Sequence, residues 1–256
     1  MLIIINLTAV PAAKAASPLD AILNFMGRRQ NTNTNTNNNS NNNDGSENSD
    51  SQGSVSNVPQ NVPDPKDVEK AAEFASQATG VDKDFLMGML VVESNLGKNT
   101  GQCTYQEVSD GAQAAYDRGR LSQSSWNIFQ KRSRIIKSLA DSLGYDYKNV
   151  KVSCNPSYAG TGGALGISQF MPDIWMDYKD AVGKIVGKAN PDPWNTEDGV
   201  IAMALLLKDT PGVTEHNLTA ERNAAKMYLS GTVSPLYDWY ANEAFYWAQN
   251  YQKLLG

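Results

Sequence analysis

Glu93 is the residue whose type and position most directly suggest chemistry. It lies in Val91-Val92-Glu93-Ser94-Asn95-Leu96-Gly97, at the end of a helix predicted to begin near Asp82. The residues that share its helix face by the i, i+3, i+4, i+7 spacing are apolar: Leu86, Met89 and Leu90. A carboxyl group with little water around it resists ionisation, so the pKa of Glu93 is expected to rise, which suits a proton donor near neutral pH. The alternative is an edge position, from which Glu93 reaches solvent or pairs with a lysine.

A second segment of chemical interest is rich in glycine. Gly160, Gly162 and Gly163 lead into Ala164-Leu165-Gly166-Ile167-Ser168-Gln169-Phe170-Met171-Pro172. Glycines allow backbone amides to approach a ligand closely, and the Gln169 amide offers both donors and acceptors. The segment lacks the Gly-Lys-Ser/Thr ending of a phosphate loop. The alternative interpretation is a tight turn before a helix.

The remaining composition excludes several classes of function. The single histidine, His216, lies in a polar loop, so it is poorly placed as the base of a Ser-His-Asp triad, and a multi-histidine metal site is excluded. We expect an ordinary surface histidine, and neither a metal nor a cofactor. The net charge is -5 and Lys and Arg are scattered along the chain, which argues against nucleic acid as the main partner.

Two cysteines, Cys103 and Cys154, flank a separate block of the chain. In an exported protein they are expected to pair, which closes a loop of about 50 residues and stabilises the fold by about 4 kcal/mol. Free thiols in a reducing compartment are the alternative, and the spacing fits no zinc pattern.

The first 63 residues differ in composition from the rest. Residues 1–16 contain a short apolar run followed by Ala13-Lys14-Ala15, which resembles a signal-peptide cleavage site, although no Lys or Arg precedes the run. An uncleaved membrane-associated segment and a disordered N-terminus are the alternatives. Residues 17–63 are dominated by Asn, Ser and Thr, a composition that buries too little apolar surface to fold. We interpret them as a disordered linker.

Residues 64–256 predict an all-α fold of one domain, with an inserted helical lobe at about 103–154. Caps and apolar periodicity indicate helices over 64–80, 82–97, 110–118, 122–143, 172–186, 196–208, 219–229 and 234–255. No stretch shows convincing strand alternation.

Three segments together resemble the lytic murein transglycosylases. They are Glu93-Ser94-Asn95-Leu96-Gly97, the stretch from Gly163 to Trp175, and Asn190-Pro191-Asp192-Pro193-Trp194-Asn195-Thr196-Glu197-Asp198. The long block between the first two is closer to the membrane-bound type B branch than to the shorter soluble type. The resemblance implies a lysozyme-like helical domain that cleaves the β-1,4 bond from N-acetylmuramic acid to N-acetylglucosamine in peptidoglycan.

By this resemblance Glu93 is the single catalytic acid/base, and the product carries a 1,6-anhydro ring. The resemblance also implies a set of substrate-binding residues: Ser94, Gly166, Gln169, Phe170, Met171 and Tyr228. Tyr228 belongs to an element in which Leu229 replaces the usual Asn, and Ile174 replaces a small hydroxyl residue before the Trp. These departures concern fine substrate contacts.

Two other functions remain open from the sequence. One is a muramidase that admits water, with Asp173 or Asp192 positioning it, and the other is a murein-binding module without activity. The resemblance places the protein outside the cytoplasm, in the periplasm, cell wall or medium, with peptidoglycan strands as partner. A monomer is expected, and the sequence names no envelope or secretion machinery.

Overall fold

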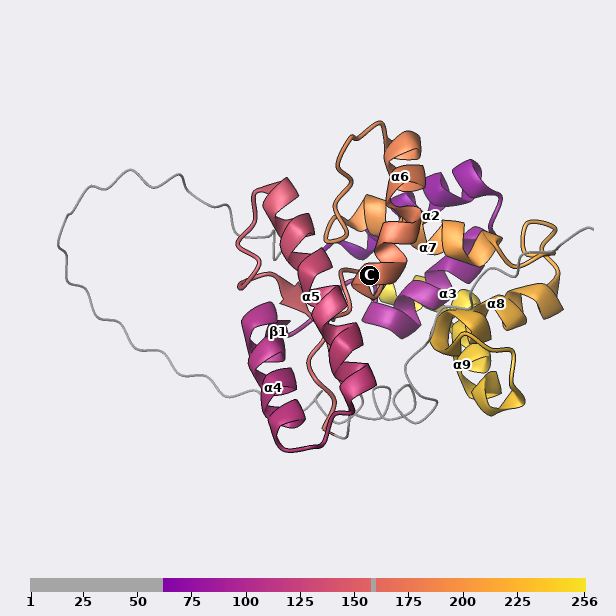
Figure 1. Ribbon diagram of the computed structural model, residues 1–256. Helices are drawn as coiled ribbons and strands as arrows, with labels where there is room; N and C mark the ends of the chain where they lie inside the picture. The colour runs from indigo at the N-terminus through magenta and orange to yellow at the C-terminus, as the bar shows by residue number, and fades with distance from the viewer. Residues whose placement is uncertain (1–61, 158–159) are drawn as a thin grey trace, which may run out of the picture.

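The computed structural model describes residues 62–157 and 160–256 (Figure 1). The predicted signal-like segment 1–16 and nearly all of the predicted linker 17–63 lie outside the described residues. The described residues are predominantly helical, which confirms the all-α prediction. The helices are α2 (Pro65–Thr79), α3 (Lys83–Ser94), α4 (Tyr105–Asp117), α5 (Gln123–Leu143), α6 (Pro172–Val186), α7 (Thr196–Lys208), α8 (Leu218–Ser230), α9 (Asp238–Ala248) and the short 3-10 turns η1 (Pro235–Tyr237) and η2 (Tyr251–Leu254).

Helix α3 lies at the centre of the main domain, with α2, α7 and α9 packed against it. Almost every residue of α3 from Phe85 to Ser94 is buried, so the helix is apolar on all sides rather than on one stripe. Asp82 begins it by accepting a hydrogen bond from the Phe85 backbone at 2.8 Å. A helix buried in this way holds its last turn, which carries Glu93, in a fixed position.

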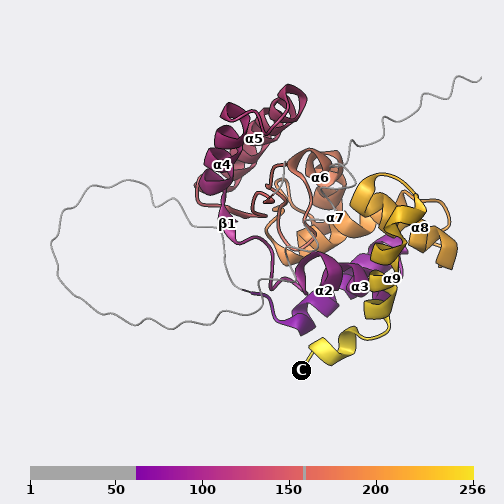
Figure 2. The ribbon, with the colours of Figure 1, turned by 90° about the horizontal axis from the view of Figure 1, so that it is seen from below.

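The block between the two cysteines forms a helical lobe of α4 and α5. At its base a short antiparallel pair, β1 (Cys103–Thr104) and β2 (Lys151–Val152), lies beside the disulfide between Cys103 and Cys154, which confirms the predicted pairing. This strand pair is a small addition to the predicted all-helical fold. Figures 1 and 2 both show the lobe on the opposite side of α6 and α7 from α8 and α9.

Three predicted helices differ from the structure in their extent. Helix α3 ends at Ser94 rather than at Gly97, because Asn95 already adopts a left-handed conformation with φ of 51°. Helix α4 begins earlier than predicted, because Thr104 and Glu107 form a reciprocal capping box. The predicted helix 234–255 is broken into η1, α9 and η2.

Within the described residues, no helix combines the length and the apolar character that a membrane span requires.

Candidate active site

The Glu93 side chain is buried, with 8% of its surface exposed, at the last turn of α3. The alternative of a solvent-exposed edge position is therefore wrong. The hydroxyl of Tyr240, a residue of α9 that is only 2% exposed, donates a hydrogen bond to Oε1 of Glu93. A buried carboxyl group is stabilised by such a donor, because little water is present to replace it.

The close crossing of α3 and α9 brings Tyr240 to Glu93. At Gly88 a Cβ atom would lie 2.1 Å from the Ala244 carbonyl oxygen, so only glycine allows this approach. Ala244 lies one helical turn after Tyr240, and Glu93 lies five residues after Gly88, as expected for two antiparallel helices. The missing side chain at Gly88 therefore sets the distance between Glu93 and Tyr240.

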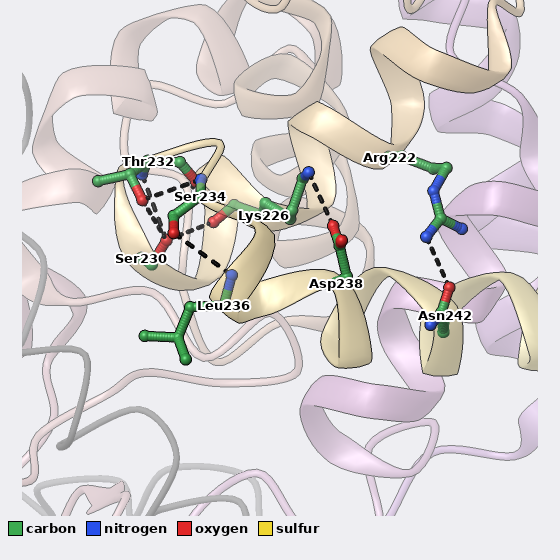
Figure 3. A network of polar contacts seen from close by, with 8 residues as sticks. All are labelled: Arg222, Lys226, Ser230, Thr232, Ser234, Leu236, Asp238 and Asn242. Carbon is green, nitrogen blue, oxygen red and sulfur yellow. Dashed lines mark hydrogen bonds and ion pairs between the residues drawn. The ribbon is translucent and has the colours of Figure 1, made fainter.

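Polar contacts fix α8 against α9 (Figure 3). The Lys226 ammonium group lies 2.9 Å from Asp238 Oδ1, and Arg222 donates a hydrogen bond of 2.6 Å to Asn242. The Ser230 hydroxyl donates to the Lys226 carbonyl oxygen at 2.9 Å and closes the end of α8. These contacts position Tyr228 on α8 relative to Tyr240 on α9.

The chain leaves α3 through three consecutive residues with positive φ. Asn95, Leu96 and Gly97 have φ values of 51°, 55° and 84°. Ser94 supports this turn, since its hydroxyl accepts a hydrogen bond of 3.1 Å from the Gly97 backbone and donates one of 3.3 Å to Leu90. In this structure Ser94 is 1% exposed and shapes the end of the helix. Its predicted contact with substrate is not tested and stays a prediction.

The glycine-rich segment forms a tight turn just before α6. The Leu165 backbone donates to the Phe170 carbonyl oxygen at 2.8 Å, and the two residues form an isolated bridge. At Gly166, where φ is 58°, a Cβ atom would lie 1.9 Å from the Pro193 carbonyl oxygen. Gly166 is thus needed for the turn to pack on the Pro191–Asn195 segment. The tight-turn interpretation is correct, and it does not exclude a ligand role.

Gln169 joins this turn to the segment that follows Glu93. Its Nε2 donates to the Gly166 carbonyl oxygen at 2.8 Å and to the Thr100 carbonyl oxygen at 3.1 Å. Thr100 lies seven residues after Glu93, on the chain that leaves α3. The amide of Gln169, which is half-buried, therefore connects two motifs that are far apart in the sequence.

Phe170, Met171 and Tyr228 surround the same turn. The Tyr228 hydroxyl donates to the Ser168 carbonyl oxygen, and its ring centroid lies 5.6 Å from that of Phe170. Phe170 is 3% exposed, whereas Met171 is half-buried and precedes the first residue of α6. Phe170 is consequently part of the packed support of the turn, and Met171 and Tyr228 are the more accessible members.

The two aspartates considered for positioning a water are both engaged elsewhere. Asp173 pairs with Arg132 at 2.9 Å. Asp192 accepts hydrogen bonds from the Tyr145 hydroxyl at 2.7 Å and from the Trp194 backbone at 2.8 Å, and burial raises its pKa. Both carboxyl groups hold the lobe against the main domain.

The other buried carboxyl groups of the described residues also lie in separate settings. Asp198 accepts a hydrogen bond of 2.7 Å from Lys188 and one of 2.8 Å from the Asp192 backbone. Burial and the charge of Asp82 raise the pKa of Glu221. Asp82 caps the start of α3 and Glu93 lies in its last turn, so about 16 Å of helix separates them. Because Asp82 acts on Glu221, Glu221 lies near the start of α3 and Glu93 lies near its end.

Sequence reasoning missed Tyr240 as a partner of Glu93. It identified Tyr240 only as one of many aromatic residues in the last helix, and no local signal distinguishes it from its neighbours. The small residues Gly88 and Ala244 could have indicated that two helices cross closely, but not which helices cross. No group of three or more His, Cys, Asp or Glu side chains suited to a metal occurs among residues 62–157 and 160–256.

The fold and site define a helical protein in which a buried glutamate lies beside a tyrosine donor, and a glycine-rich turn is hydrogen-bonded to the chain that leaves its helix. The chain matches the family described as Transglycosylase SLT domain over residues 36–235, and it belongs to that family. The predicted resemblance to lytic transglycosylases is confirmed at the level of the family.

Several solved structures are similar to this chain. Lytic transglycosylase Slt35 of Escherichia coli, in complex with calcium, is 23% identical, with a TM-score of 0.43 over 60% of this chain and 44% of that one. Soluble lytic transglycosylase SltB1 of Pseudomonas aeruginosa is 24% identical, with a TM-score of 0.42 over 58% and 45%. The catenated form of SltB1 from Pseudomonas aeruginosa is 17% identical, with a TM-score of 0.49 over 96% and 90%.

This chain spans less than half of the length of Slt35. No curated protein sequence matches it.

Proposed function

We propose that this protein is an exported peptidoglycan lytic transglycosylase that uses Glu93 as its single acid/base. The observation that carries the proposal is the burial of Glu93 beside Tyr240, at a helix end connected through Thr100 and Gln169 to the glycine-rich turn. Membership of the Transglycosylase SLT domain family supplies the reaction class. The proposed substrate-binding residues are Ser94, Gly166, Gln169, Phe170, Met171 and Tyr228.

The proposed reaction needs only one carboxyl group. Protonated Glu93 gives its proton to the glycosidic oxygen as the bond from that oxygen to C1 of N-acetylmuramic acid breaks. The C6 hydroxyl of the same sugar then attacks C1, and the Glu93 carboxylate takes the hydroxyl proton. One C–O bond breaks and one forms, no water is consumed, and Glu93 is protonated again at the end.

The two aspartates considered for positioning a water favour this assignment over hydrolysis. A hydrolase that uses two carboxyl groups holds the second one about 5–9.5 Å from the first, on the other side of the bond. Asp173 and Asp192 are occupied by Arg132 and Tyr145. Internal attack by the sugar hydroxyl needs no second carboxyl group in the mechanism.

Product analysis tests the proposal. Purified peptidoglycan is incubated with the full chain, and soluble products are separated and weighed by mass spectrometry. We expect muropeptides with 1,6-anhydro ends, each lighter by one water than the product of hydrolysis. Reducing ends instead of anhydro ends would identify a muramidase.

Glu93→Gln and Glu221→Gln form a matched pair for this assay. Both replace a buried glutamate of the same domain by its amide. We expect Glu93→Gln to abolish anhydro products and Glu221→Gln to retain them. If the unaltered chain binds peptidoglycan but shows no lysis at any pH, the result would instead support a non-catalytic murein-binding module.

The same proposal sets the location and the partner. An enzyme with this substrate acts in the periplasm, in the cell wall or outside the cell, and residues 1–16 are proposed to direct export or to associate with the membrane. Its partner is the peptidoglycan strand, and it acts as a monomer. Fractionation and size-exclusion chromatography of the expressed chain test these two points.

A further inference from the structure

The solvent-facing side of α5 carries a row of cations: Lys131, Arg134 and Lys137, all of them exposed. On a helix with 3.6 residues per turn these positions fall within an arc of about 120° and span about 9 Å along the axis. No Asp or Glu occurs between Gln123 and Ala140. The scattered appearance of Lys and Arg in the sequence is therefore misleading in this helix, and we call these three residues the α5 cation face.

The three cations have no ion-pair partner within the described part of the chain. Arg132, on the inner side of the same helix, is the one cation of this stretch that pairs, with Asp173 at 2.9 Å. The Lys137 ammonium group lies 5.2 Å from the centroid of the Tyr147 ring, which leaves it exposed to an anion. Three neighbouring exposed cations repel one another unless an external anion neutralises them.

The charge of the lobe differs in sign from that of the chain. Residues 103–154 contain eight Lys and Arg against five Asp and Glu, a net charge of +3, whereas the whole chain has a net charge of -5. An acidic protein with one basic lobe orients that lobe toward an anionic surface. This asymmetry predicts a partner that carries many negative charges.

We propose that the α5 cation face binds the free carboxylates of the peptide stems of peptidoglycan. This proposal rests on the function proposed above, because the glycan backbone itself is uncharged and its peptide stems supply the anions. Cations of lysine and arginine bind carboxylates through charge-assisted hydrogen bonds. The lobe thereby holds the enzyme on a strand whose peptide stems are intact.

The cation face has a fixed position relative to the glycine-rich turn. Helix α5 packs on α6, and Asp173, which pairs with Arg132, lies two residues after Met171. A second contact holds the base of the lobe, where the Trp194 indole donates a hydrogen bond of 2.8 Å to the carbonyl oxygen of Lys151 in β2. A strand seated at the turn can therefore contact the lobe without rearrangement of the fold.

The test measures binding of the full chain to peptidoglycan. The test variant is Lys131→Gln/Arg134→Gln/Lys137→Gln, and the control Lys66→Gln/Lys184→Gln/Lys208→Gln removes three exposed cations from other helices. Binding is measured by co-sedimentation with intact peptidoglycan and with peptidoglycan whose stem carboxylates have been converted to amides. Both are repeated at about 0.05 M and about 1 M salt, where the screening length falls from more than 10 Å to about 3 Å.

We expect the test variant to bind intact peptidoglycan about 10-fold more weakly than the control variant at low salt. The difference should vanish on amidated peptidoglycan and at high salt. Turnover of a short soluble glycan should be the same in both variants, because none of the substituted residues belongs to the site. Circular dichroism confirms that both variants are folded.

Several results would overturn the proposal. Equal binding of the two variants to intact peptidoglycan removes the role of α5. A difference that persists on amidated peptidoglycan assigns the face to another ligand. Absence of turnover by the unaltered chain refutes the enzymatic proposal alone, since the binding difference is measured independently of lysis.

Discussion

Replacing Gly88 by alanine tests whether the crossing of α3 and α9 controls the site. The added Cβ atom would lie 2.1 Å from the Ala244 carbonyl oxygen, whereas ordinary contact begins at 3.4 Å. The two helices must therefore separate by about 1.3 Å, because the obstacle is backbone and cannot rotate away. This separation moves Tyr240 away from Glu93.

Two magnitudes follow for Gly88→Ala. Overpacking of this kind costs about 1–3 kcal/mol, and a domain of this size loses about 2–4 °C of melting temperature per kcal/mol. Misplacement of a catalytic group by about 1 Å reduces turnover by about 100-fold. We expect the melting temperature to fall by roughly 2–12 °C, and lysis measured well below it to fall by about two orders of magnitude.

Gly183→Ala is the matched control for this experiment. Its Cβ atom would lie 2.6 Å from the Lys188 carbonyl oxygen, on α6 and away from Glu93. We expect a comparable loss of stability with turnover retained. Tyr240→Phe removes only the hydroxyl that donates to Glu93, and it should reproduce much of the loss of turnover with a smaller change in volume. Unchanged turnover in Gly88→Ala, or an equal loss in Gly183→Ala, would refute the reasoning.

Two further predictions concern stability. The paired variant Cys103→Ser/Cys154→Ser opens a loop of sequence separation 51 and should lose about 4 kcal/mol, seen as a lower urea midpoint that reductant no longer changes. Glu221→Gln should be more stable than the unaltered chain at neutral pH, because burial raises the folded-state pKa of Glu221 and makes its charged form unfavourable. Above pH 4.5, the ordinary pKa of a glutamate, the folded state therefore binds more protons than the unfolded state. The stability of the unaltered chain falls as the pH rises through the window between this ordinary pKa and the raised one. Below the window the advantage of Glu221→Gln should disappear, and an advantage of equal size at all pH values would contradict this explanation.

Local signals in the sequence were sufficient to predict most of the helices. Asp64, Asp82 and Ser122 each cap a helix with their side chains, as their residue types and positions predict. The break between η1 and α9 escaped prediction because aromatic residues recur throughout the stretch that follows Ser234 and show no clear period. Tertiary packing decides such stretches, and packing is not visible in one sequence.

The site was predictable in part. Glu93 and Gln169 were identified because a carboxyl group on an apolar face and a run of glycines are local features. Their connection through Thr100 and the contribution of Tyr240 depend on residues 69 and 147 positions apart, respectively, along the chain. Distances of this kind emerge only when the helices are assembled, so the partners of a predicted residue are harder to identify than the residue itself.

The backbone around the site shows how the fold maintains this arrangement. Four non-glycine residues of the described chain have positive φ, and three of them, Asn95, Leu96 and Gln169, belong to the two motifs. Each such conformation costs about 1–3 kcal/mol and persists only where the surroundings enforce it. Leu96 is fully buried, and its backbone donates to the Leu90 carbonyl oxygen at 3.2 Å, so burial and the helix end enforce its conformation.

Both strained turns have the same consequence for chemistry. The turn after Glu93 stops α3 while the carboxyl group is still inside the protein, and the turn at Gln169 directs an amide back to the chain leaving that helix. A regular helix continued to Gly97 would place Thr100 elsewhere and remove the acceptor of Gln169. The strain is therefore explained by the need to keep one carboxyl group buried and fixed, as the proposed role of Glu93 as both acid and base requires.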